Sequence, residues 1–221
     1  MIVTIDGPAG SGKSTAARKL AARLELPYLD TGAMYRAIAY AALSRGVDPA
    51  DEDAVIALAR EVSLELDCGP THTRVRLDGH DVSEAIRSLA VSEASGAVAR
   101  IGPIRELLIA RQRQIARDLG SIVTEGRDQG AVVFPEADAK FVVVASLERR
   151  VRRRLEQLAA EGEDADIEAV RENLRVRDEK DSPQWAPLLD PGQAIVIDTS
   201  HLTIAQVIDM MSDHVLNPRA G

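Results

Sequence analysis

The segment GPAGSGKST at residues 7–15 constrains the fold of this chain more than any other. Residues 7–14 match the pattern G-x-x-x-x-G-K-[ST] in full. The match follows the apolar run 2–5 and precedes a stretch rich in Ala, Leu, Lys and Arg. A glycine loop between a buried strand and a helix is the context in which this pattern indicates a site for a nucleoside triphosphate. A glycine-rich turn that carries a lysine by chance is the alternative, and the flanking strand and helix disfavour it.

Each residue type in the loop suits the chemistry of a phosphate site. Gly7, Gly10 and Gly12 permit positive φ, so that successive N–H groups can converge on phosphate oxygens at a helix N-terminus. Lys13 can reach the β and γ phosphates, and the Ser14 hydroxyl is placed to ligate Mg²⁺. The residues expected to contact ATP are Gly7, Pro8, Ala9, Gly10, Ser11, Gly12, Lys13, Ser14 and Thr15.

The hydrophobic pattern predicts an α/β fold. Continuous β-branched runs that do not alternate in polarity are typical of strands buried on both faces. Such runs occur at 2–5, 121–124, 140–145 and 194–197, with a weaker candidate at 27–30. Helical patterns lie between them, at 13–24, 104–119, 147–160 and 167–177. Strands separated by helices favour a parallel sheet covered by helices.

One stretch departs from this pattern. Residues 63–67 and 74–77 alternate polar and apolar side chains ahead of the turn-like DGHD sequence. Alternation is typical of a one-sided antiparallel sheet. Residues 62–100 are therefore predicted to form an inserted lobe.

Composition narrows the partners and the compartment. The chain has 27 basic and 35 acidic residues, a formal net charge of -8, which disfavours non-specific binding to nucleic acid or an anionic membrane. Cys68 is the only cysteine, which excludes an internal disulfide and suits a reducing cytosol. No secretory or membrane-spanning pattern is found, so we expect a cytoplasmic protein with small-molecule partners.

Arginines near strand ends are the candidates for binding a second small anion, because phosphoryl transfer depends on positioning and charge. The segment DTGAMYRA predicts a helix capped by Asp30 or Thr31 that carries Arg36. The segment EGRDQG places Arg127 and Asp128 at the carboxyl end of strand 121–124, where open α/β sheets bind ligands. For DTGAMYRA the alternative is an ordinary capped helix with a surface arginine. For EGRDQG it is a salt-bridged turn.

Two charged helical segments have open interpretations. In RVRDEKD, Arg177 and Asp181 are spaced i and i+4, so they share a helix face. They are either site residues or a solvated charge pair. Residues 148–157 contain five arginines and form either a lid over phosphates or a solvated or RNA-binding face. The negative net charge disfavours RNA.

These motifs, in this order along the chain, resemble bacterial cytidylate kinases, above all in the long string GRDQGAVVFPEA. The resemblance implies one P-loop kinase domain over 1–221, with an adenylate-kinase-like five-stranded parallel sheet. It also implies an inserted monophosphate-binding lobe at 36–102, a small antiparallel sheet at about 62–82 within that lobe, and a lid at 147–168.

The resemblance further implies Mg²⁺-dependent phosphoryl transfer from ATP to CMP or dCMP by a monomer. Lys13 and Arg127 would be catalytic, and Ser14 would ligate the metal. Arg36 and Arg127 would bind the acceptor phosphate, and other residues would bind the base and ribose. The full set expected to bind CMP is Thr31, Arg36, Arg105, Arg127, Asp128, Arg177 and Asp181.

Three positions depart from the family pattern. Glu125 stands where the family commonly has Asp, Gly96 where a serine touches the sugar, and Gln184 where a further arginine is usual. We expect these departures to weaken substrate binding modestly without changing the reaction class. The alternatives are a P-loop kinase for another small anion, such as a sugar or shikimate, and a non-catalytic regulatory P-loop module.

Overall fold

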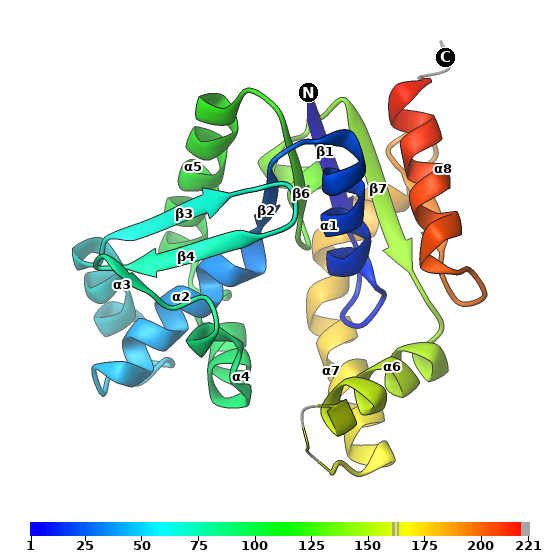
Figure 1. Ribbon diagram of the computed structural model, residues 1–221. Coiled ribbons are helices and arrows are strands. Elements are labelled where there is room, and N and C mark those ends of the chain that lie inside the picture. Colours follow the sequence, from blue (N-terminus) through cyan, green and yellow to red (C-terminus); the bar gives the residue numbers. More distant parts are fainter. Residues whose placement is uncertain (161, 163, 218–221) are drawn as a thin grey trace. The chain divides into compact units, whose positions relative to one another are not determined.

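The computed structural model describes residues 1–160, 162 and 164–217 (Figure 1). The strands are β1 (Ile2–Asp6), β2 (Tyr28–Asp30), β3 (Leu64–Cys68), β4 (Thr73–Leu77), β5 (His80–Asp81), β6 (Ile122–Glu125), β7 (Ala139–Val144) and β8 (Ile195–Asp198). The helices are α1 (Lys13–Leu24), α2 (Thr31–Ser44), α3 (Glu52–Glu61), α4 (Leu89–Val98), α5 (Gly102–Leu119), α6 (Leu147–Ala160), α7 (Ile167–Trp185) and α8 (Ile204–Leu216). None of the helices in the described part is both long enough and apolar enough to cross a membrane.

The central feature is a five-stranded sheet in the order β2-β6-β1-β7-β8. β1 pairs in parallel with β7, and β7 pairs in parallel with β8, with Phe141 opposite both Ile5 and Ile195. Val3, Ile5 and Phe141 are fully buried, as expected for strands covered on both faces. The predicted α/β class is confirmed, and each of the five strands lies within one residue of its predicted bounds.

The chain divides into two compact units, of which the first comprises Met1–Glu25 and Val123 onward. In this unit α1 and α8 pack against each other and run alongside β1 and β7 (Figure 1). α1 begins at Lys13 and ends at Leu24, as predicted. Gly12 caps this helix with φ +95°, a left-handed conformation that favours glycine.

The prediction that the 167–177 helix ends at Arg177 is wrong, because α7 continues to Trp185. Proline 183 lies inside α7. Its missing N–H removes only the hydrogen bond to the carbonyl of residue 179, and the helix ends two residues later. Ion pairs from Asp178 and Asp181 to other elements hold the added turns in place.

The second unit comprises Leu26–Ile122. Its helix α2 starts at the cap residue Asp30, whose carboxylate accepts a hydrogen bond from the Ala33 N–H at 3.0 Å. The alternating segments form β3 and β4, which pair antiparallel, and β5 completes a three-stranded sheet. In β4 Val75 and Leu77 are buried while Arg74 and Arg76 are exposed, so the alternation reflects a sheet with one covered face.

Thr73 joins β2 to this small sheet. Its hydroxyl donates to the Tyr28 carbonyl at 2.6 Å and accepts from the Asp30 N–H at 3.0 Å. The Tyr28 N–H also donates to the carbonyl of Gly69, in the turn between β3 and β4. The small sheet therefore positions the start of α2, where two of the predicted site residues lie.

Replacing Gly7 by Ala should destabilise the fold strongly. A Cβ at Gly7 would lie 2.2 Å from the Val143 carbonyl oxygen, at φ +135°, so the β7 backbone would have to shift. We expect Gly7→Ala to lower the free energy of unfolding by about 3 kcal/mol, measured by urea denaturation. Gly192→Ala is the matched control, because Gly192 also has positive φ (+82°) but no atom within 4 Å of its Cβ position. Equal losses in the two variants would contradict the proposed clash.

Candidate functional site

The segment between β1 and α1 has the backbone that its glycines predict. Gly7, Gly10 and Gly12 have φ of +135°, +74° and +95°. Lys13 is only 7% exposed, and its ammonium donates to the Pro8 carbonyl at 3.2 Å. Ser14 and Thr15 are exposed in the first turn of α1. A lysine and a helix N-terminus therefore meet at one loop, which is the arrangement that favours binding of phosphate.

Lys13 lies among four charged residues that are distant in the sequence. Burial, followed by the positive charge of Arg127, lowers the pKa of Lys13 from 10.5 to about 7. Glu125 and Asp181 act in the opposite direction and raise the pKa, while Arg177 lowers it. The structure thus gathers the expected residues Arg127, Arg177 and Asp181 around the loop lysine.

Asp181 pairs with Arg127 and not with its helical neighbour Arg177. The Arg127 Nε donates to Asp181 Oδ2 at 2.9 Å, and both side chains are partly buried. The charges of Arg177 and Asp181 both act on Lys13, which agrees with the shared helix face expected from their i, i+4 spacing. The partner of Asp181 comes instead from the segment that follows β6, which helical spacing alone does not reveal.

Asp6, whose charge interacts with those of Lys13 and Asp128, is a residue that the sequence analysis did not single out. It is fully buried, and its two carboxylate oxygens accept the N–H groups of Gln129 and Gly130, both at 2.8 Å. Burial raises the pKa of Asp6 from 3.8 to about 6. These bonds hold the short π-helical segment Gln129–Val133, and with it the buried Asp128, against the end of β1. The sequence signal that could have identified Asp6 is an acidic residue directly after the apolar run 2–5.

The expected residues Thr31, Arg36 and Arg105 lie in the second unit. Thr31 is buried at the start of α2. One turn later, Arg36 pairs with Asp30 through Nη2 and Oδ2 at 2.8 Å. Asp30 therefore caps α2 with one oxygen and holds Arg36 with the other. Arg105 is half-buried on α5, whereas Asp128 belongs to the first unit.

Two of the five arginines in 148–157 turn toward the glycine loop. Arg150, only 5% exposed, donates to the Ala9 carbonyl at 3.2 Å and pairs with Asp178 through both terminal nitrogens, at 2.9 and 2.5 Å. Arg153 donates to the Ser11 carbonyl at 2.8 Å. Neither sequence interpretation included these contacts. Their i, i+3 spacing, which puts both on one helix face, was the available signal.

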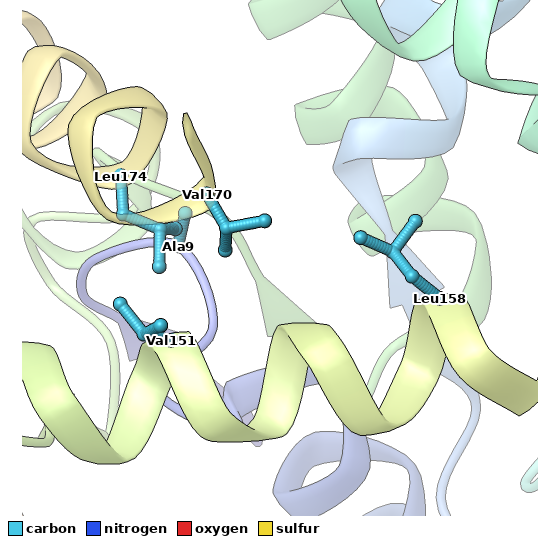
Figure 2. Close-up of a cluster of buried hydrophobic side chains, with 5 residues drawn as sticks. All are labelled: Ala9, Val151, Leu158, Val170 and Leu174. Carbon is cyan, nitrogen blue, oxygen red and sulfur yellow. The ribbon is translucent and has the colours of Figure 1, made fainter. Parts of the chain in front are cut away.

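Apolar packing joins the same helices to the loop. Ala9, Val151, Val170 and Leu174 converge where α6 and α7 approach the loop, and Leu158 projects from α6 further along (Figure 2). Within the 147–168 segment predicted as a lid, residues 161 and 163 lie outside the described residues. The contacts of Arg150, Val151 and Arg153 attach the first half of α6 to the loop.

The three departures from the family pattern fall in different elements. Glu125 is buried at the carboxyl end of β6. Gly96 lies in α4 beside Ser95, whose hydroxyl donates to the Ser92 carbonyl at 2.8 Å. Gln184 lies in the last turn of α7. Of these, Glu125 acts on Lys13, because its charge raises the lysine pKa.

The parallel sheet, the glycine loop after β1 and the buried lysine at the start of α1 define the class of P-loop kinase folds. The fold resembles that of shikimate kinase from Bacteroides thetaiotaomicron, with a TM-score of 0.50, 12% identity and 98% of each chain covered.

The family is shown by sequence comparison. The family model for cytidylate kinase matches residues 3–217. The cytidylate kinase of Nocardia farcinica is 45% identical over 96% of this chain and 92% of its own length. That of Mycobacterium avium is 47% identical over 97% and 95%. The chain belongs to the cytidylate kinase family, a family of phosphotransferases, which confirms the resemblance noted in the sequence.

The lowered pKa of Lys13 makes a prediction about proton uptake. With a pKa of about 7, most Lys13 side chains are neutral at pH 8, whereas a bound triphosphate favours the charged form and raises the pKa. At pH 8 we therefore expect ATP binding to take up about one proton. Calorimetric titration in buffers of different ionisation enthalpy measures this number.

Lys13→Arg is the control, because arginine stays charged throughout this range. It should bind ATP without proton uptake, and its affinity should not weaken between pH 7 and 9 as that of the wild type does. Equal proton uptake by the two proteins would show that Lys13 does not titrate there.

Proposed function

We propose that this protein transfers the γ-phosphoryl group of ATP to CMP or dCMP, giving ADP and CDP or dCDP. Family membership supports the reaction class. The observation that carries the proposal is that Arg127, expected to bind the acceptor, pairs with Asp181 at 2.9 Å, and the charges of both act on the buried Lys13, expected to bind the donor. Donor and acceptor phosphates bound at Lys13 and Arg127 would be neighbours, as an in-line transfer requires.

The loop and Lys13 would bind the donor triphosphate. N–H groups at the start of α1 would donate to phosphate oxygens, and the Lys13 ammonium would exchange its bond to the Pro8 carbonyl for one to the β and γ phosphates. During transfer the bond from the γ-phosphorus to the bridging oxygen breaks, while a bond to an acceptor phosphate oxygen forms. Lys13 and Arg127 would stabilise the charge on the transferring group.

The acceptor needs no strong general base, because its attacking oxygen is already anionic. Arg36 and Arg127 would bind the phosphate of CMP, for which the planar guanidinium fork is well suited. Each arginine is held by a carboxylate, Asp30 or Asp181, which orients the guanidinium group. Arg177 and Asp181 would contact the ribose.

Asp128, Arg105 and Thr31 would read the base. The N4 amino group of cytosine can donate a hydrogen bond to the Asp128 carboxylate, and Arg105 can donate hydrogen bonds to the acceptors of the ring. Uracil presents an acceptor where cytosine has the amino group, so it would face the carboxylate unfavourably. Asp128 is buried, so binding a base that leaves its carboxylate unpaired, or that faces it with an acceptor, would cost binding free energy.

The residues near the loop fit a magnesium ion that arrives with the nucleotide. Mg²⁺ prefers oxygen ligands and is usually held by one or two protein groups together with substrate phosphates and water. The exposed Ser14 hydroxyl would ligate it, and the Glu125 carboxylate would orient its water ligands. Bound there, the ion would neutralise charge on the transferring phosphates. Among the described residues, no three His, Cys, Asp or Glu side chains are grouped to hold a metal.

The two alternative functions are a kinase for another acceptor and a regulatory module without an acceptor. A kinase for a sugar or for shikimate does not need a carboxylate that accepts a hydrogen bond from an amino group of the acceptor. A regulatory module does not need Arg36 and Arg127 to be oriented by carboxylates. We also propose that the protein acts as a monomer in the cytoplasm, on small molecules only. The net charge of -8 and the lone Cys68 support this assignment.

Replacing Asp128 tests the function and the base reader together. ADP formation is measured with CMP, dCMP, UMP, AMP, GMP and shikimate as acceptors. The wild type should prefer CMP and dCMP, and Asp128→Ala should lower kcat/KM for them by about 100-fold. Asp128→Asn should shift preference toward UMP, because the amide can donate to the uracil carbonyl.

Two outcomes would overturn the proposed function. Bound ATP without turnover of any acceptor would identify a regulatory module. A strong response to shikimate or another acceptor would retain the kinase class and reject the substrate. An unchanged CMP preference in Asp128→Ala would remove Asp128 as the base reader.

A further inference from the structure

Side chains hold three backbone carbonyls of the glycine loop. The Pro8 carbonyl accepts from Lys13 Nζ at 3.2 Å, and the Ala9 carbonyl accepts from Arg150 Nη1 at 3.2 Å. The Ser11 carbonyl accepts twice, from Arg153 Nη1 at 2.8 Å and from the Thr199 hydroxyl at 2.9 Å. Three separate elements therefore supply the donors: α1, α6 and the segment directly after β8.

Each held carbonyl determines where the next N–H group points. A trans peptide is planar, so its C=O and N–H point in opposite directions. Fixing the carbonyl of Ala9 turns the Gly10 N–H away from Arg150. Fixing the carbonyl of Ser11 turns the Gly12 N–H away from Arg153 and Thr199.

This restraint matters most at glycine. Gly10 and Gly12 have no Cβ to restrict φ, so the peptide groups that precede them can rotate at low energetic cost. Both glycines have positive φ, +74° and +95°. Hydrogen bonds to the preceding carbonyls supply the restraint that the missing side chains do not.

We propose that Arg150, Arg153 and Thr199 are positioning residues that orient the N–H groups of Gly10 and Gly12 toward a bound triphosphate. The inference rests on triphosphate binding by the loop, which is part of the proposed function. In this role they act through the loop carbonyls and not through a contact with the substrate. Arg150 and Arg153, two of the five arginines in α6, thus have a role other than the lid or the solvated face that the sequence left open.

The contact at Ser11 is the stronger of the two. Thr199 is 4% exposed, and its hydroxyl also lies 3.1 Å from the Val144 carbonyl, at the end of β7. Arg153 donates to the Thr199 hydroxyl at 3.1 Å and to the Thr199 carbonyl at 2.9 Å. Ser11, Arg153 and Thr199 thus form one connected group that ties the loop to the end of the sheet.

Arg150 is less suited to a test, because it also pairs with Asp178 of α7. Its removal would leave the Asp178 carboxylate without that partner and would disturb the packing between α6 and α7. Arg153 and Thr199 are the better choices.

The decisive measurement is the affinity for inorganic tripolyphosphate, which has no base or ribose, alongside KM for ATP, KM for CMP and kcat. We expect Thr199→Val and Arg153→Met to weaken tripolyphosphate binding and to raise KM for ATP by the same factor, about tenfold. KM for CMP should stay within about twofold, and Thr199→Ser should restore tripolyphosphate binding because it keeps the hydroxyl.

Arg171→Met is the matched control. Arg171 lies on α7 and pairs with Glu148 of α6 and with Glu168, so its loss weakens the same helix pair without removing a donor to the loop. It should bind tripolyphosphate as the wild type does. An equal loss in Arg171→Met would attribute the effect to general loosening of α6 and α7 and would overturn the proposal.

Two further outcomes would overturn it. Weaker ATP binding with unchanged tripolyphosphate binding would place Arg153 and Thr199 at the nucleoside. Unchanged binding of both ligands, with only a lower unfolding midpoint, would make their role structural. Wild-type protein that binds tripolyphosphate but does not phosphorylate CMP would overturn the proposed function alone.

The amide proton of Gly12 provides an independent readout in folded protein. On addition of tripolyphosphate to the wild type, we expect it to shift downfield as its N–H donates to a phosphate oxygen. In Thr199→Val the shift should be smaller at saturation, and in Thr199→Ser it should match the wild type. Equal shifts in all three proteins at saturation would show that Thr199 does not orient this peptide.

Discussion

The close approach of the Gly7 backbone to the Val143 carbonyl is the constraint on which the rest of the site depends. β1 and β7 are adjacent parallel strands, and the chain that leaves β1 must pass directly over the end of β7 before α1 begins. A side chain at residue 7 would occupy the space of the β7 backbone. Glycine at this position lets the loop lie close to the sheet, where Lys13 is buried among charges from two other segments, 125–127 and 177–181.

Buried charge near the loop is matched by specific partners. Two backbone N–H groups stabilise the Asp6 carboxylate, and Asp178 pairs with Arg150 in a two-point geometry. Asp181 likewise holds Arg127. Because an unpaired buried charge is costly, these partners determine the orientation of each side chain more strictly than packing alone would. These carboxylates consequently order the site, and of the three only Asp181 would also contact a ligand, the ribose, in the proposed reaction.

Much of the fold could be predicted because it depends on local pattern. Runs such as 2–5 and 140–145 are continuous and β-branched, and they mark strands covered on both faces. The end of α7 was not predictable in this way, because its added turns are held by ion pairs from Asp178 and Asp181 to residues distant in the sequence. Site residues in recognisable motifs were named from the sequence. Asp6 and Thr199 were not, because each acts through hydrogen bonds to a segment more than 120 residues away.

The sequence by itself determined the class of fold, the phosphate loop and the family, since each of these is written in contiguous residues whose conformational and chemical preferences are local. Only the tertiary structure decided which charges meet. It brought Arg127 to Asp181, Arg150 to Asp178, and Arg153 and Thr199 to one carbonyl of the loop. The physical reason is that burial makes electrostatic partners necessary, while the identity of each partner depends on how strands and helices pack.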